Sequence, residues 1–181
     1  CFLHTFEQAR IFEPFVLLQA GFDTANDYIS KNQDEERWGE TSSPTTFAVA
    51  IMTDAELFLA SAGECRMFLV RGSEAHQLNT VHSFAEKMIA LGQITSCEEL
   101  LKHPHTARTY RAIGFAENGQ FEDYCDPVQG IFLQTNDCLV ICSDTVMGEC
   151  LQQVDNQVLK DCFCQPDLDV QQAVEKLLNH T

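Results

Sequence analysis

The chain has 181 residues, of which 45% are hydrophobic and 21% charged, as is ordinary for one soluble globular domain with a buried core. Its formal net charge of −16 argues against nucleic acid or an anionic membrane as a partner, because both would repel it. No apolar run approaches the roughly 20 residues of a membrane span, and the N-terminus has no signal-peptide pattern. The nine cysteines, odd in number and irregularly spaced, favour free thiols and a cytoplasmic location.

The N-terminal third is predicted to be helix followed by loop. Apolar residues at spacings of three to five predict a helix over residues 1–32, which Pro14 should kink or divide in two. The polar stretch Asn32–Pro44 is typical of an exposed loop. Trp38 in this loop is either a lid on the core or, beside the acidic run Asp34–Glu36, the anchor of a docking site for a basic protein partner. Because the chain begins with Cys1 and not Met, we expect a piece of a longer protein.

The middle of the chain predicts strands and then two short helices. The strands are expected at Thr46–Met52, Glu56–Ala62, Cys65–Val70 and around His76–Leu78. Their nearly continuous apolar character predicts a sheet that is covered on both faces. Ser83 should cap a helix over Phe84–Leu91 that ends at Gly92, with Glu86 at the capping-box position, and Ser96 should cap a second helix over Cys97–Lys102.

The C-terminal part returns to strands and ends in helices. The strands are expected at Tyr110–Phe115, around Val128–Leu133 and at Cys138–Cys142, and the helices at Gly148–Cys162 and Val170–Leu178. Asp167 or Asp169 should cap the last helix, and Asp137 should form the turn before Cys138. We therefore predict a single α+β domain over residues 1–181, with two packed, mostly antiparallel sheets flanked by helices.

Five segments, in order, carry a family resemblance. They are Thr45–Ala50 ("GTT"), Ala60–Arg66 ("vGDSR"), Gln77–Ser83 ("qLTxDHS"), the stretch from Ala90 to Gly114 ("G-x-I-t … hP … ltRalG") and Asn136–Asp144 ("GDxlllcSDG"). Together they resemble the metal-dependent serine/threonine protein phosphatases, the PPM or phosphatase 2C family. The resemblance implies two packed antiparallel sheets with helices outside, incomplete here at both ends.

The resemblance also implies a two-cation site that this chain matches at few positions. The family takes oxygen ligands for Mg²⁺ or Mn²⁺ from an N-terminal "DGxGG" segment, from the Asp of "SDG" and from a C-terminal "DN". Only the middle ligand maps here, onto Asp144, while Glu64 stands where "GDSR" has Asp. Glu64 and Asp144 could hold one cation weakly if their side chains converge. Asp155-Asn156 is a poor substitute for the last motif, because it lies within a predicted helix.

Three further departures favour a loss of catalysis. Val81 replaces the Asp of "DHS", Thr145 follows Asp144 in place of Gly, and Gly148 stands where active members often carry another metal-binding Asp. We therefore predict an inactive phosphatase-like domain that acts as a binding or regulatory module for a protein partner or phosphoprotein, and no cofactor for the chain as given. The alternative is a Mg²⁺- or Mn²⁺-dependent protein serine/threonine phosphatase, seen without its terminal metal-ligand segments.

Other residues have plainer interpretations. Arg66 and Arg111 could contact phosphate in an active enzyme, but in so acidic a chain we expect them to pair with carboxylates. His103-Pro104-His105 could ligate zinc, yet a surface loop at a helix end is the simpler reading. Cys162-Phe163-Cys164 lacks a second pair at zinc-finger spacing. The oligomeric state is left open by the sequence.

Overall fold

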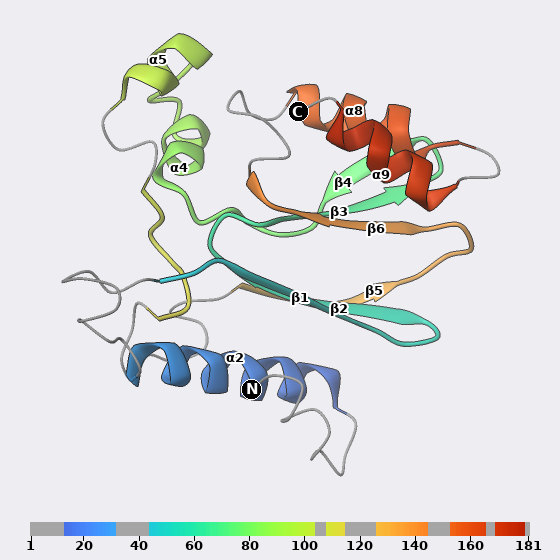
Figure 1. The fold of residues 1–181 in the computed structure, drawn as a ribbon, viewed down its shortest axis with the longest axis horizontal. Coiled ribbons are helices and arrows are strands. Elements are labelled where there is room, and N and C mark those ends of the chain that lie inside the picture. Colours follow the sequence, from blue (N-terminus) through green and yellow to red (C-terminus); the bar gives the residue numbers. More distant parts are fainter. Residues whose placement is uncertain are drawn as a thin grey trace.

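The fold is a two-layer β-sandwich with helices on its outer faces (Figure 1). It was obtained as a computed structural model, which describes residues 13–31, 44–103, 108–114, 126–144, 153–165 and 169–179. One sheet has the order β1-β2-β5 and the other β4-β3-β6, and every pairing is antiparallel. This confirms the predicted α+β class and its two packed sheets.

The strands follow the predicted ranges closely. Their bounds are β1 Phe47–Met52, β2 Glu56–Ala62, β3 Arg66–Arg71, β4 Glu74–Gln77, β5 Asp126–Phe132 and β6 Cys138–Cys142. The central strands β2 and β3 are buried along most of their length. This confirms, for these two strands, the prediction that continuously apolar strands are covered on both faces. The turn after β5 does not close a hairpin, because β5 and β6 belong to different sheets.

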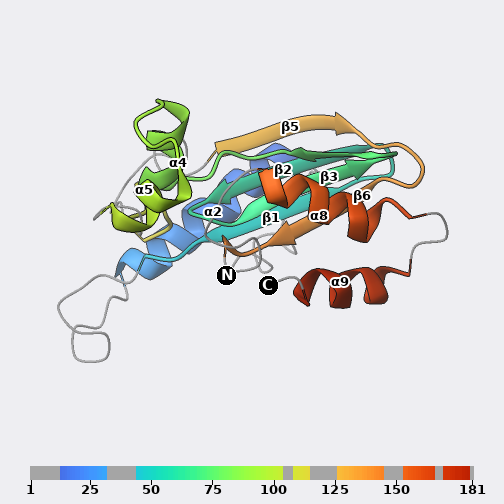
Figure 2. The same ribbon diagram turned by 90° about the horizontal axis from the view of Figure 1, so that it is seen from above.

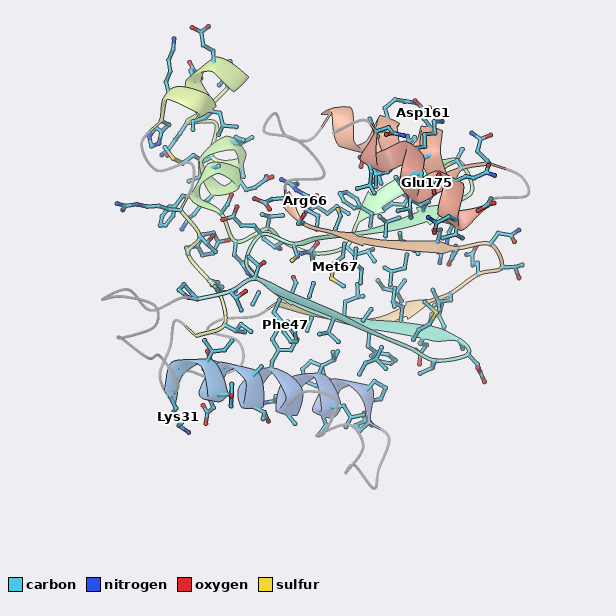
Figure 3. The ribbon with its side chains drawn as sticks, viewed as in Figure 1. Lys31, Phe47, Arg66, Met67, Asp161 and Glu175 are labelled. Carbon is cyan, nitrogen blue, oxygen red and sulfur yellow. The ribbon has the colours of Figure 1, made fainter. Side chains whose placement is uncertain are left out.

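Three apolar layers hold the sandwich together. Between the sheets, Leu57, Leu59 and Met67 are fully buried, and Figure 3 shows Met67 pointing into this layer. On the outer face of the β1-β2-β5 sheet, Phe22 of helix α2 (Pro14–Lys31) packs on Phe47, with ring centroids 4.9 Å apart. On the other outer face, α8 (Gln153–Phe163) and α9 (Val170–Leu178) cover β3, β4 and β6.

The helix ends agree in part with the prediction. Pro14 is the first residue of α2, where its missing N–H costs nothing, so it does not kink this helix. Ser83 caps α4 (Phe84–Ala90) and Ser96 caps α5 (Cys97–Lys102), both as predicted. The C-cap of α4 is Leu91 and not Gly92, which follows with a φ of +67°. Asp169 caps α9 by accepting from two backbone N–H groups.

One predicted strand is absent from the described residues. In the described part of the range Tyr110–Phe115, the backbone forms one isolated bridge, between Ile113 and Thr45. The Tyr110 amide donates to the His82 carbonyl, whereas the Ile113 amide donates to the Thr45 carbonyl. Because the bonds go to two separate segments, no continuous ladder forms, so the strand prediction was wrong.

The predicted start of the helix after β6, at Gly148, lies outside the described residues, as does the helix predicted before residue 13. Within α8, the Asp155-Asn156 pair is helical, as expected. None of the helices in the described part of the chain is long and apolar enough to cross a membrane.

Candidate functional site

The two predicted carboxylates lie at the same end of one strand pair. Glu64 is in the turn between β2 and β3, and the exposed Asp144 comes two residues after β6. In the antiparallel β3–β6 ladder, Arg66 pairs with Cys142. Glu64 precedes Arg66 by two residues and Asp144 follows Cys142 by two residues, so both lie just beyond the same end of this ladder. That the two side chains share a cation stays a prediction.

The turn that carries Glu64 is held in a conformation that requires glycine. Gly63 has a φ of +95°, and a Cβ at this position would lie only 2.9 Å from the Cα of Thr46. The backbone N–H of Gly63 donates to Nδ1 of His82 over 3.1 Å, and its carbonyl accepts from the His82 amide over 2.9 Å. The fully buried His82 therefore fixes the backbone next to Glu64 from both sides.

Asn79 holds the same turn from a second direction. Its Oδ1 accepts from the Met67 amide over 2.8 Å, and its Nδ2 donates to Ser61 Oγ and to the Cys65 carbonyl, each over 2.9 Å. Asn79 and Ser61 are both buried, so these bonds form away from water. The end of β2, the turn and the start of β3 are thereby tied to one side chain.

Arg66 anchors helix α4 to this end of β3. Its Nη2 donates to Oε1 of Glu86 over 2.7 Å, and the exposed fractions of the two side chains are 4% and 14%. This confirms the expectation that Arg66 pairs with a carboxylate. Glu86 occupies the predicted capping-box position, and its carboxylate reaches across to the sheet. Figure 3 shows Arg66 near the end of β3.

The possible cation ligands are two oxygen donors. Oε1 of the half-buried Glu64 accepts a hydrogen bond from Oγ1 of Thr109. Val81, which replaces an acidic residue of the family motif, is buried and 5% exposed. Carboxylates suit Mg²⁺ or Mn²⁺, but two of them are too few for a two-cation centre. Within the described residues, no group of three or more His, Cys, Asp or Glu side chains could hold a metal ion.

Asp137, at the far end of β3, forms the predicted turn and also an ion pair. Its carboxylate accepts from the Gln134 amide over 2.8 Å and from Nε and Nη2 of Arg71 over 2.9 and 2.7 Å. The hydrogen bond from Arg71 lowers the pKa of Asp137, and the same bond raises the pKa of Arg71. This pair braces the turn between the two sheets.

The cysteines that the structure describes are not cross-linked. Cys65, Cys138, Cys142, Cys162 and Cys164 are thiols that form no disulfide, as the sequence led us to expect for the cysteines. Burial raises the pKa of Cys138, Cys162 and Cys164, which keeps these thiols protonated.

Several residues named from the sequence lie outside the described ranges. They are Trp38, Thr145, Gly148 and Asp167, together with Pro104 and His105 of the possible zinc motif. Sequence reasoning missed the roles of Asn79 and His82 as anchors of the Glu64 turn. The only signal for them was their place in the segment Gln77–Ser83, which already carried the family resemblance.

Comparison with known proteins identifies related phosphatases by sequence. The chain is 27% identical over 116 residues to the serine/threonine phosphatase Stp of Listeria innocua, a match over 64% of this chain and 44% of that protein. It is 33% identical over 101 residues to the protein phosphatase PhpP of Streptococcus pneumoniae, over 55% of this chain and 38% of that protein. The chain thus spans less than half the length of these curated relatives. No family model matches it.

Solved structures share the fold over nearly the whole chain. The serine/threonine phosphatase of S. agalactiae superimposes with a TM-score of 0.73 and 22% identity, covering 95% of this chain and 67% of that one. The catalytic domain of the phosphatase PstP, solved in complex with two manganese ions, superimposes with a TM-score of 0.69 and 17% identity. That superposition covers 98% of this chain and 70% of the PstP chain.

Proposed function

Since this chain belongs to the PPM, phosphatase 2C-like family, we propose that it is a phosphatase-like domain without catalytic activity, acting as a binding or regulatory module. The observation that carries the proposal is the replacement of an acidic residue by Val81. Val81 takes the place of an acidic residue in the family's "DHS" segment, and its side chain is buried. The substitution removes a carboxylate from one of the five segments that carry the family resemblance.

The state of the two carboxylates supports the same proposal. Glu64 is one methylene longer than the family's Asp and accepts a hydrogen bond from Thr109. Binding a cation through the same oxygen would compete with that bond. The substitutions at Thr145 and Gly148 add to the argument at the level of sequence.

The partner of such a module would be a protein or phosphoprotein recognised without turnover. The fold around the Glu64 turn is kept by buried hydrogen bonds of Asn79, His82 and Arg66. A protein that retains this fold but has lost its metal ligands can still bind a partner through its surface. The docking role of Trp38 and of the acidic run Asp34–Glu36 stays a proposal of the same kind.

A second function has its own support. The relatives found by sequence are named as phosphatases, and the β3–β6 register directs Glu64 and Asp144 to the same end of the sandwich. On this alternative, Asp144 and Glu64 would contribute to a Mg²⁺ or Mn²⁺ site completed by further residues of the parent protein. Bound cations would supply the activated water and neutralise phosphate charge.

Hydrolysis of p-nitrophenyl phosphate with Mn²⁺ by the protein expressed from its full reading frame separates the two functions. The proposal predicts that this protein and its Asp144→Ala variant release nitrophenol at the same rate as buffer. Activity of the unmodified protein that is lost in Asp144→Ala would refute it. The full reading frame gives a second check, since the alternative predicts a "DG" segment before residue 1 and a "DN" after residue 181.

A further inference from the structure

Two basic side chains differ from the other cations of this acidic chain. With 27 acidic and 11 basic residues, pairing with a carboxylate is the expected state of a cation here. The side chains found in such ion pairs are those of Lys31, Arg66, Arg71, Lys102 and Lys160. Lys176 donates to the backbone carbonyl of Asp161. Among the residues that the structure describes, Lys87 and Arg108 are exposed and form no ion pair.

These two cations lie beside one pair of aromatic rings. The Nζ atom of Lys87 is 5.6 Å from the centroid of the Tyr110 ring, and the Phe84 ring meets Tyr110 edge-on with centroids 5.8 Å apart. The carbonyl of Arg108 accepts from the Phe84 amide over 2.8 Å, so the backbone of Arg108 runs beside the first turn of α4. Figures 1 and 2 both show α4 and α5 at one end of the strands, apart from α8 and α9.

The nearest carboxylates along the chain are engaged elsewhere. Glu86 precedes Lys87 but binds Arg66, and its side chain is only 14% exposed. Glu64 accepts from Thr109, the residue between Arg108 and Tyr110. Neither carboxylate forms an ion pair with Lys87 or Arg108. The outer side of α4 therefore carries local positive charge on a molecule whose net charge is −16.

Apolar side chains complete the same surface. Phe84, Lys87 and Leu91 are three and four residues apart, so they share one face of the helical turn. Phe84 is 36% exposed and Leu91 63% exposed. Exposed apolar side chains that are gathered next to charged ones are a common composition of protein interaction sites.

We propose that Phe84, Lys87, Leu91, Arg108 and Tyr110 form a docking surface for an acidic peptide segment of a partner protein. This inference rests on the proposed function, in which the domain binds a protein without turnover. The guanidinium of Arg108 can bind a carboxylate through two N–H groups, and the Lys87 ammonium can bind a second one. An apolar side chain between these carboxylates would cover Phe84 and Leu91.

Charge complementarity selects this occupant. Two cations without carboxylate partners favour an anionic segment and disfavour a basic one. The net charge of −16 repels an acidic peptide at long range, so direct contacts with this surface have to supply the affinity.

Fluorescence anisotropy with the protein expressed from its full reading frame tests the proposal. The probe is the labelled peptide Asp-Glu-Asp-Leu-Glu-Asp-Glu, and its control is Asn-Gln-Asn-Leu-Gln-Asn-Gln. We expect the acidic peptide to bind and the uncharged one to bind much more weakly. Lys87→Gln and Arg108→Gln should each raise the dissociation constant at least about threefold, and the double variant about tenfold.

Lys31→Gln is the matched control variant. It removes the same charge from a helical lysine that is 59% exposed but pairs with Asp27 on α2. This variant should leave the dissociation constant unchanged. An equal effect of Lys31→Gln would overturn the proposal, because the peptide would then respond only to net charge.

The comparison of the two peptides uses only the unmodified protein, so it does not depend on how the variants fold. No binding of the acidic peptide would overturn the proposal. Equal binding of the uncharged peptide would assign the surface to an apolar partner and would overturn it too. The titration involves no phosphate release, so the proposed function is tested separately. Catalysis by a protein that shows the expected binding would refute the proposed function and still support this docking surface.

Discussion

The two ends of β3 are stabilised by different kinds of interaction. At the Glu64 end, Arg66, Asn79 and His82 form hydrogen bonds that are almost entirely shielded from water. At the far end, Arg71 pairs with Asp137, but the Arg71 side chain is 33% exposed. Buried polar groups are costly when they lose a partner, whereas water can replace the partner of an exposed group. The end that carries the candidate site should therefore be the more sensitive to substitution.

Glu86→Ala should produce the largest effect. It removes the 2.7 Å partner of the Arg66 guanidinium, whose side chain is 4% exposed. Loss of one member of a buried ion pair costs about 3–5 kcal/mol in the free energy of unfolding. Urea denaturation followed by circular dichroism would measure it.

Glu98→Ala is the matched control for that change. Glu98 is also a helical glutamate, and it pairs with Lys102 over 2.5 Å, but its side chain is 79% exposed. Its loss should cost no more than about 0.5 kcal/mol. Equal effects of the two variants would show that the Arg66–Glu86 pair gains nothing from its burial.

Asn79→Ala should rank second. The substitution leaves the amide of Met67 and the hydroxyl of Ser61 without their hydrogen-bond partner in the interior. We expect a loss of about 2–3 kcal/mol in the free energy of unfolding, from desolvated groups that water cannot reach. If Asn79→Ala lowered the free energy of unfolding by less than Glu98→Ala does, water would have to enter the turn and replace the hydrogen bonds of Asn79.

Asp137→Asn should have the smallest effect at neutral pH and a recognisable pH dependence. The pKa of Asp137 is lowered in the folded protein, chiefly by the hydrogen bond from Arg71, so the folded state binds this proton more weakly than the unfolded state. The stabilisation is complete above the ordinary pKa of an unfolded Asp and is lost as the pH falls through the lowered pKa.

Thermal unfolding between neutral and acidic pH checks this dependence. The parent chain should be more stable than Asp137→Asn at neutral pH, and the difference should shrink in the acidic range. A difference that is independent of pH would show that the pair acts through packing and not through the charge of Asp137.

The strands were largely predictable because local patterns determine them. Glu56–Ala62 and Cys138–Cys142 were predicted at their observed bounds, since each is an apolar run closed by turn residues. The helix caps Ser83, Ser96 and Asp169 could also be predicted, because a capping side chain binds backbone amides only two or three residues away. The strand at Tyr110–Phe115 failed because its composition does not reveal that its hydrogen bonds go to two separate segments.

The candidate site was predictable in its residues but not in its arrangement. Asp144 and Glu64 were chosen by motif, yet 80 positions separate them, and only the β3–β6 register shows that they lie at the same end. The partner of Arg66 was likewise beyond sequence reasoning, because Glu86 comes from a helix packed against the sheet. Trp38 stays a prediction, since it lies outside the described residues.

The central claim, a retained phosphatase fold without catalysis, is tested most directly by phosphate release from a phosphothreonine peptide at saturating Mn²⁺. The protein expressed from its full reading frame and its Asp144→Ala variant would be compared at equal concentration. The account predicts equal release from both, indistinguishable from a protein-free control. Release by the unmodified protein that exceeds the control and is abolished in Asp144→Ala would contradict it.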